Sequence, residues 1–305
     1  MAGMLEGVRR GRHAWVLSLA LLGGACAQAV SADEELIGPQ APQLPAYVHY
    51  VEGRAWKIDL RGREEALNEG MLIERGEGVR TETATFVSLV SGDGSRIVLP
   101  SSSQVELLWE EPSQRLQVVL RQGQVESYVR RQAGEDRYQV LTPVGVLGVR
   151  GTHFRVRVAE GEARSLSEVL EGGVAAHREH DAGEPVLIEA RQGLNLVSQG
   201  ELRPVDLLPA PRLLGQGGRH VRPGDWTLLL QPLPGASRYR VQLASDEQFL
   251  RIRQERFSTT PSVSFSELQA DTYHVRLSAF DDEGLEGLTS AYQIFYVPAR
   301  PRNAP

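Results

Sequence analysis

The chain has 305 residues, of which 41% are hydrophobic and 24% charged, so it can bury a core and general disorder is excluded. This length is enough for two domains of ordinary size. The formal net charge of −6, without a clustered basic stripe, argues against a nucleic-acid partner.

Residues 1–32 have the pattern of a secretory signal peptide. Arg9, Arg10 and Arg12 precede an apolar run over 14–25, and small residues follow up to Ala32. The run is shorter than the about 20 residues that cross a bilayer. We therefore predict cleavage after Ala32 and an exported chain without a transmembrane segment.

The alternative for this region is a lipoprotein signal, with Cys26 as the lipidated residue. Cys26 is the only cysteine of the chain, so cleavage after Ala32 would leave none. Lipidated chains usually have leucine three residues before the cysteine, whereas Gly23 stands there. Soluble export is the favoured prediction, and an outer-membrane lipoprotein is the less favoured one.

The next two segments are a linker and an all-β region. Residues 33–46 are rich in proline and acid, which is typical of a linker. Over 47–205, short Val-, Leu- and Ile-rich runs alternate with glycine turns, and no helical period is sustained. This spacing predicts a β-sandwich or a solenoid-like stack of strands.

The stretch from Thr142 to Val158 cannot be one uninterrupted strand. Phe154, Val156 and Val158 alternate on one face, but Leu147 and Val149 fall on the other. The change straddles Gly148 and the triplet 150–152, where Gly148 and Gly151 could supply a positive φ or a close backbone approach. We predict that this triplet fixes the geometry between two β layers; the alternative is that Arg150 meets an acidic partner.

A weak internal echo supports stacking. A shift of 49 residues places Gly123 on Gly172 and Val125 on Val174. Stacked β units and a chance similarity of hairpins both explain it.

The C-terminal part predicts a second β domain. Residues 206–222, rich in Pro, Gly and Arg, indicate a second linker, and 299–305 a terminal tail. Between them, residues 223–298 have the size of an immunoglobulin-like sandwich. Tyr239, Val241 and Leu243 share one strand face, as do Tyr273, Val275, Leu277 and Ala279 on a later strand.

The broken strand resembles the signature of the FecR domain, an exported bacterial β-domain found in iron-siderophore regulators and other secreted proteins. Segments 77–82, 87–100, 120–129, 169–176 and 190–197 resemble its other elements, so the likeness covers about 47–200. The resemblance implies a periplasmic location and a signalling or scaffolding role. Its structural motif residues are Thr142, Pro143, Val149, Arg150, Gly151, Thr152 and Phe154.

The C-terminal domain resembles a bacterial fibronectin type III module. Gln231 stands where that family usually has a core tryptophan, and Trp226 lies five positions earlier. The resemblance implies that Tyr273 is the corner tyrosine, whose hydroxyl binds a main-chain group.

Two departures from the FecR relatives affect the expected partners. Only about a dozen residues precede the apolar run, so direct binding of a sigma factor is not expected. Residues 33–46 are too short for the peptidoglycan-binding LysM module of some secreted relatives.

The sequence predicts no metal site, cofactor or enzymatic activity. On a strand His177 and His180 would face opposite ways, Asp93 is a lone carboxylate in a turn, and the acidic segment 281–284 is typical of a solvated turn. No catalytic motif of the hydrolases or phosphate-binding enzymes is present.

The favoured function is that of a non-catalytic periplasmic protein that binds or scaffolds envelope proteins, a membrane sensor being one candidate partner. Edge strands of two β domains would supply the pairing surfaces. The alternative is a protein that binds cell-wall peptidoglycan or exopolysaccharide glycans.

Overall fold

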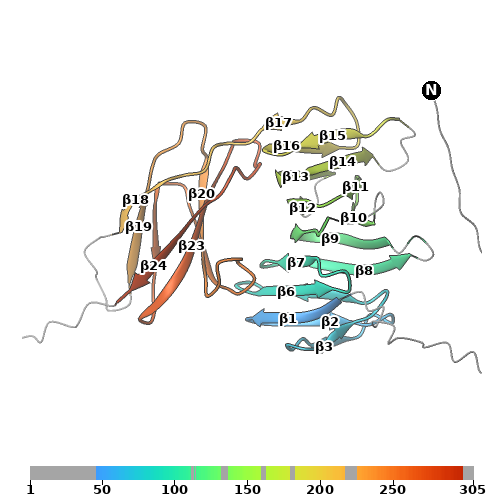
Figure 1. The fold of residues 1–305 in the computed structure, drawn as a ribbon, viewed down its shortest axis with the longest axis horizontal. Helices are drawn as coiled ribbons and strands as arrows, with labels where there is room; N and C mark the ends of the chain where they lie inside the picture. Colours follow the sequence, from blue (N-terminus) through green and yellow to red (C-terminus); the bar gives the residue numbers. More distant parts are fainter. Residues whose placement is uncertain are drawn as a thin grey trace, which may run out of the picture. The chain divides into compact units, whose positions relative to one another are not determined.

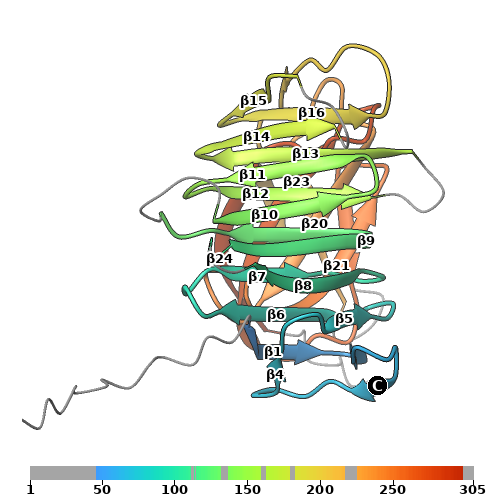
Figure 2. The same cartoon turned by 90° about the vertical axis from the view of Figure 1, so that its right-hand side faces the viewer.

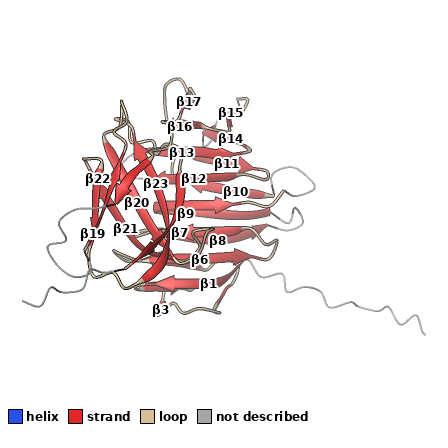
Figure 3. Cartoon of the chain, turned by 60° about the vertical axis from the view of Figure 1, so that its left-hand side comes forward, coloured by secondary structure: helices blue, strands red, loops and turns tan. Residues whose placement is uncertain are grey.

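The computed structural model describes residues 46–110, 113, 115–131, 137–158, 163–178, 183–216 and 225–297. The predicted signal peptide 1–32 with Cys26, the predicted linker up to residue 45 and the tail 299–305 lie outside these residues. Within the described ranges every regular element is a strand, which confirms the all-β prediction (Figures 1 and 3). None of these residues forms a helix long and apolar enough to span a bilayer. The described part belongs to one compact unit.

The first 17 strands form two sheets that share the long strand β9 (Arg115–Tyr128). Figure 2 shows strands of both sheets lying one above another, from β1 up to β15 and β16. Sheet A consists, in spatial order, of β4 (Leu72–Ile73), β1 (Ala46–Glu52), β6 (Phe86–Ser91), β7 (Arg96–Leu99), β9, β12 (His153–Val158), β13 (Arg164–Glu171), β16 (Gln192–Val197) and β17 (Val205–Asp206). Sheet B consists of β3 (Glu64–Ala66), β2 (Ala55–Ile58), β5 (Gly78–Thr81), β8 (Gln104–Glu110), β9, β10 (Tyr138–Thr142), β11 (Gly145–Val149), β14 (Gly173–Arg178) and β15 (Val186–Glu189). We call this pair of sheets the first sandwich.

Strand β9 joins the two layers of the first sandwich. Its first half pairs with β8 and β10 in sheet B, and its second half pairs with β7 and β12 in sheet A. At the corner Gly123 has φ +84°, and a Cβ there would lie 2.5 Å from the Ser102 carbonyl oxygen. Only glycine fits this corner without displacing the neighbouring backbone.

The core of the first sandwich lies between the two sheets. Leu116, Val118 and Leu120 of β9 point inward from sheet B, and Phe154 and Val156 of β12 point inward from sheet A. The period of two in these strands places alternate residues in the core between the sheets, which agrees with the predicted all-β fold.

The predicted break in the strand over 142–158 is a corner between the layers. β11 ends at Val149 in sheet B, and β12 begins at His153 in sheet A. Gly151 lies between them with φ +63°, and the pairing of β12 with β13 shifts register after His153. Gly148 is a regular β11 residue, paired with Gln139 and Ala175.

The 49-residue echo marks two corners and not two copies of a stacked unit. Gly123 and Gly172 both have φ +84°. However, the chain passes from sheet B to sheet A at Gly123 and from sheet A to sheet B at Gly172.

The second sandwich has seven strands in two sheets. Sheet C has the order β18 (Leu213–Gln216), β19 (Trp226–Leu230) and β22 (Ser262–Phe265). Sheet D has the order β21 (Ile252–Ser258), β20 (Arg238–Ala244), β23 (Asp271–Phe280) and β24 (Ser290–Tyr296). Strand β18 falls inside the predicted linker 206–222, where Gly215 and a register shift beside it interrupt the alternation.

The core of the second sandwich is aromatic at one end. Trp226 is buried against the rings of Tyr273 and Tyr296, and its Nε1 donates to Gln216 Oε1 at 2.9 Å. The Tyr273 hydroxyl donates to the Gln269 carbonyl at 3.1 Å, which confirms the predicted corner tyrosine.

Candidate functional site

Three side chains of alternating charge, acidic, basic and acidic, form a row on the outer face of sheet A. Arg155 on β12 lies directly opposite Glu126 on β9 and Glu168 on β13. Because Phe154 and Val156 point into the core, Arg155 must point outward, yet it is only 1% exposed. Side chains of the second sandwich cover this row, and we call the contact the ionic seam.

The first cluster of the seam is centred on Glu126. Both terminal nitrogens of Arg276, on β23, donate to the two Glu126 carboxylate oxygens at 2.7 Å, a bidentate fork. The Arg276 Nε donates to Gln242 at 2.8 Å. His153 Nε2 lies 2.8 Å from Glu126 Oε1, and its ring stacks on Tyr128 with the centroids 4.0 Å apart.

The second cluster is centred on Glu286, in the segment between β23 and β24. Its carboxylate forms ion pairs with Arg155 at 2.8 Å and with Arg240 at 2.9 Å. The Ser278 hydroxyl also donates to it. Arg155 donates in addition to the main-chain carbonyls of Glu286 and Gly287, at 2.7 and 2.8 Å.

Two further carboxylates complete the seam. Glu168 accepts a bond from Arg157 at 3.2 Å and from the main-chain N–H of Glu286 at 3.0 Å. Glu255 on β21 pairs with Arg240. Every carboxylate of the seam therefore faces a guanidinium, the arrangement that a buried charge requires.

The electrostatics of the seam favour ionised Glu126 and Glu286. Burial alone would raise both pKa values, but Arg276 and His153 hold the pKa of Glu126 well below its usual value. Likewise Arg155 and Arg240 lower the pKa of Glu286 to about 2. Glu168 differs: burial raises its pKa, and Arg157 and Arg155 offset this only in part.

Apolar clusters lie at two further places between the sandwiches. Phe86 and Val98 of sheet A pack with Phe249 and Ile252 of the second sandwich. Leu166 of β13 packs with Leu207 and Leu285. These contacts and the paired charges suit the seam to fixing the two sandwiches together.

The predicted motif residues surround the corner between β11 and β12. Thr142, Val149 and Phe154 are buried, whereas Pro143 and Arg150 are exposed. The Thr142 hydroxyl donates to the Gly145 carbonyl at 3.0 Å.

Thr152 makes the remaining side-chain contacts of this corner. Its hydroxyl donates to the Gly173 carbonyl at 2.9 Å and lies 3.3 Å from the Arg150 carbonyl. Arg150 is thus a surface residue, and the main-chain contacts of the corner come from Thr152.

Of the residues considered as metal ligands in the sequence, the structure describes His177 and Asp93 but not His180. His177 is half-buried on β14, and His180 lies outside the described residues. Asp93 accepts bonds from Ser91, Ser95 and the Ser95 N–H inside its own turn. The described ranges hold no cluster of three or more metal-ligating side chains.

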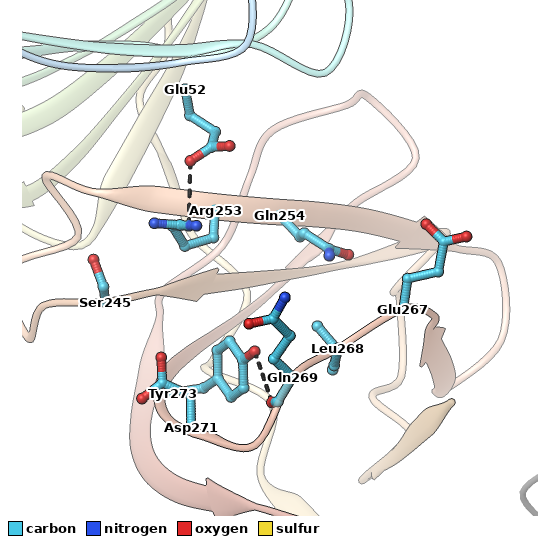
Figure 4. Close-up of a pocket in the computed structure, with 9 residues that line it drawn as sticks. All are labelled: Glu52, Ser245, Arg253, Gln254, Glu267, Leu268, Gln269, Asp271 and Tyr273. Atoms are coloured by element: carbon cyan, nitrogen blue, oxygen red, sulfur yellow. Dashed lines mark hydrogen bonds and ion pairs between the residues drawn. The ribbon is translucent and has the colours of Figure 1, made fainter. Parts of the chain in front are cut away.

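A polar cavity of about 220 Å³ lies where Glu52 of β1 meets the second sandwich (Figure 4). Glu52 Oε2 forms an ion pair with Arg253 Nε at 3.2 Å, so the charge of this guanidinium is already balanced. The Tyr50 hydroxyl also donates to Glu52; burial and this carboxylate raise the pKa of Tyr50 to about 12.

A second cavity, of about 410 Å³, lies on the first sandwich. Its walls are polar throughout: Arg80, Thr81, Glu82, Thr83, Ser102, Ser103, Gln104 and Gln122. Two of these residues contact Trp56, which does not itself line the cavity: its indole Nε1 donates to Glu82 at 2.9 Å, and Arg80 lies over its ring at 6.0 Å.

The outer face of sheet B carries an aliphatic strip. Val119, Leu141 and Val146 lie side by side on β9, β10 and β11. Val119 is 8% exposed, whereas Leu141 and Val146 are partly exposed. This aliphatic strip lies within the segment with the motif residues.

Comparison with known proteins identifies one family match within the chain. Residues 77–175, about a third of the chain, match the family model of the FecR protein, so this segment contains a FecR domain. It includes the motif corner, the Glu126–Arg155–Glu168 row and the aliphatic strip. No curated protein matches the chain.

Among solved structures, two crystal structures of a "putative anti-sigma factor" from Parabacteroides distasonis are similar, each with a TM-score of 0.37 and 16% identity over 42% of this chain. The chain spans 59% of the length of those proteins. The FN1–FN3 domains of chicken CNTN1 match with a TM-score of 0.24 and 11% identity, over 84% of this chain and 99% of theirs. TM-scores this low do not establish a shared fold.

Proposed function

We propose that this chain is a non-catalytic periplasmic scaffold that binds other proteins of the cell envelope and acts in envelope signalling. The aliphatic strip of Val119, Leu141 and Val146 is the observation that carries this proposal. Aliphatic side chains gathered on an open sheet face are typical of a protein-binding surface. The FecR match over 77–175 supports the link to signalling, since this segment contains the strip.

The ionic seam supports the scaffold part of the proposal. It joins the two sandwiches through paired buried charges, so the aliphatic strip would be presented on a fixed body. The charges of the seam are engaged in ion pairs, which agrees with a structural role.

The experiment is capture of partners from an envelope extract with the purified chain and with Leu141→Lys. A partner bound through the aliphatic strip is retained by the parent chain and lost by Leu141→Lys, because the ammonium would be buried in an apolar contact. Leu214→Lys is the matched control, since Leu214 is an exposed leucine on β18 of the other sandwich. Equal capture by all three chains would contradict the proposal.

The periplasmic location is part of this proposal and is supported by the arginines and apolar run of residues 1–32. Mass spectrometry of the N-terminus of the mature chain tests it. A new N-terminus after Ala32 agrees with soluble export, and a lipid on Cys26 with an outer-membrane lipoprotein. An uncleaved chain in the cytosol would contradict both.

Glycan binding is a second candidate, favoured by the 410 Å³ cavity on the first sandwich. The amides of Gln104 and Gln122 and the hydroxyls of Ser102 and Thr83 can bind sugar hydroxyls. Sedimentation with purified cell-wall sacculi tests this candidate. Binding that is lost in Gln104→Ala would place the glycan in this cavity.

A further inference from the structure

The strand edges of the two sandwiches differ in how well they resist pairing with another chain. Natural edge strands are commonly short, charged or bulged, and each of these features hinders the addition of a further strand. In the first sandwich the edge strands β3, β4, β15 and β17 are two to four residues long. In the second sandwich β18 and β22 have four residues each, and β18 also has a register shift.

The two long edges belong to sheet D. Strand β21 has seven residues, but it carries Arg253, Glu255 and Arg256 and its pairing shifts register at one end. Strand β24 also has seven residues, over Ser290–Tyr296, and none of them is charged or proline. It pairs with β23 without interruption from Ser290 to Tyr296, and no described strand pairs with its other edge.

The side chains of β24 are complementary to a second copy of the same strand. Ala291, Gln293 and Phe295 are exposed on one face, while Ile294 and Tyr296 face the core. Gln293 is the central residue of the strand. Antiparallel pairing about Gln293 places Phe295 of each copy opposite Ala291 of the other, a large side chain beside a small one.

The same pairing satisfies the polar groups. The two Gln293 amides would lie side by side, and each amide has both a donor and an acceptor for the other. Because the strand has no charge, the pairing brings no like charges together. An isologous contact of this kind closes after two copies and leaves no free β24 edge.

We propose that two copies of this chain pair through β24, antiparallel and centred on Gln293, so that the two D sheets become one continuous sheet. The contact involves one strand per copy, so the dimer forms reversibly with concentration. The resulting dimer presents two aliphatic strips. The pairing is independent of the proposed function, because it uses a different sheet.

Light scattering of the purified chain over a concentration series tests the pairing. The mass is expected to rise from that of one chain to that of two as the concentration increases. Phe295→Lys is expected to raise the dissociation constant at least about tenfold, because each copy then places an ammonium against the methyl of Ala291. Leu229→Lys, an exposed leucine on β19, is the matched control and should leave dimerisation unchanged.

The register is tested by restoring the contact and by cross-linking. Adding Ala291→Glu to Phe295→Lys should restore dimerisation, since opposite charges then face each other across the pair. In a chain with Cys26→Ser, Gln293→Cys should form a disulfide-linked dimer on oxidation, whereas Ala291→Cys should not, because its two copies lie about four residues apart along the strands.

The opposite results would overturn the proposal. A mass of one chain at every concentration rules out the dimer. Dimerisation that is unaffected by Phe295→Lys, or cross-linking through Ala291→Cys and not Gln293→Cys, rules out this edge or this register. Neither result bears on capture of envelope partners through the aliphatic strip.

Discussion

The two outer faces of the first sandwich contrast in chemistry and in cover. The outer face of sheet A carries the Glu126–Arg155–Glu168 row and is buried by the second sandwich. The outer face of sheet B carries Val119, Leu141 and Val146, of which the last two are partly exposed. Polarity alone therefore does not reveal which face of a sheet is covered, because charges can be buried once each has its partner.

In β12 the sequence could predict which residues share a face, but not what covers the outer face. Its alternation placed Phe154, Val156 and Val158 on one face, and all three are buried. The same alternation places Arg155 on the outer face but cannot say what covers that face. The cover depends on Arg276 and Glu286, more than a hundred residues later, which no local pattern connects to β12.

A usable signal for the seam existed across strands. Glu126, Arg155 and Glu168 stand directly opposite one another, so correct strand pairing would have revealed an acid–base–acid row. The corner tyrosine Tyr273 was predicted from the resemblance to a fibronectin type III module, and its contact, to the Gln269 carbonyl, is local. Strand β18 was not, because its pattern is broken at Gly215.

The largest expected effect is the loss of one partner in the seam. Glu126→Ala leaves the guanidinium of Arg276 buried without its carboxylate, so the free energy of unfolding should fall by about 3–5 kcal/mol. Urea denaturation of both chains measures this. Glu110→Ala, which removes an exposed partner of Arg115, should cost less than about 1 kcal/mol. Equal effects of the two substitutions would show that the seam is open to water.

Acid should lower the free energy of unfolding by an amount comparable to that of Glu126→Ala, because it protonates carboxylates of the seam. The pKa of Glu286 is lowered from 4.5 to about 2 in the folded chain, so its stabilisation is present above pH 4.5 and is lost as the pH falls towards 2. This amounts to about 3 kcal/mol. Glu126, with its lowered pKa, acts in the same direction, whereas Glu168, with its raised pKa, is more favourable at low pH and offsets part of the loss.

Denaturation at a series of pH values measures this dependence. Glu286→Gln should flatten the curve between pH 4.5 and 2, because the amide does not titrate there. A parent curve that is already flat over this interval would contradict the assignment of Glu286 to a buried ionised state.

A smaller effect is expected when both partners of the Glu126–Arg276 pair are made apolar. Glu126→Leu with Arg276→Met removes both charges and their desolvation, so stability should return to within about 1–2 kcal/mol of the parent. The measure is the coupling free energy from a double-mutant cycle with the two single variants. Additive losses would show that the two side chains do not interact across the seam.

The smallest expected effect is on the open face of sheet B, where a hydroxyl should be tolerated. Val146→Thr adds a hydroxyl to a side chain that is partly exposed, so water can satisfy it and stability should change by less than about 0.5 kcal/mol. Val156→Thr makes the same change on the core face of β12, where Val156 is fully buried. There the hydroxyl loses its hydrogen bonds to water, and the cost should be about 1–3 kcal/mol.

The two substitutions are chemically identical. The difference between their losses in free energy of unfolding, measured by urea denaturation, therefore reports how deeply each side chain is buried. A large cost at Val146 in the purified chain would mean that the aliphatic strip is itself buried, and the contrast between the two faces of the first sandwich would then disappear.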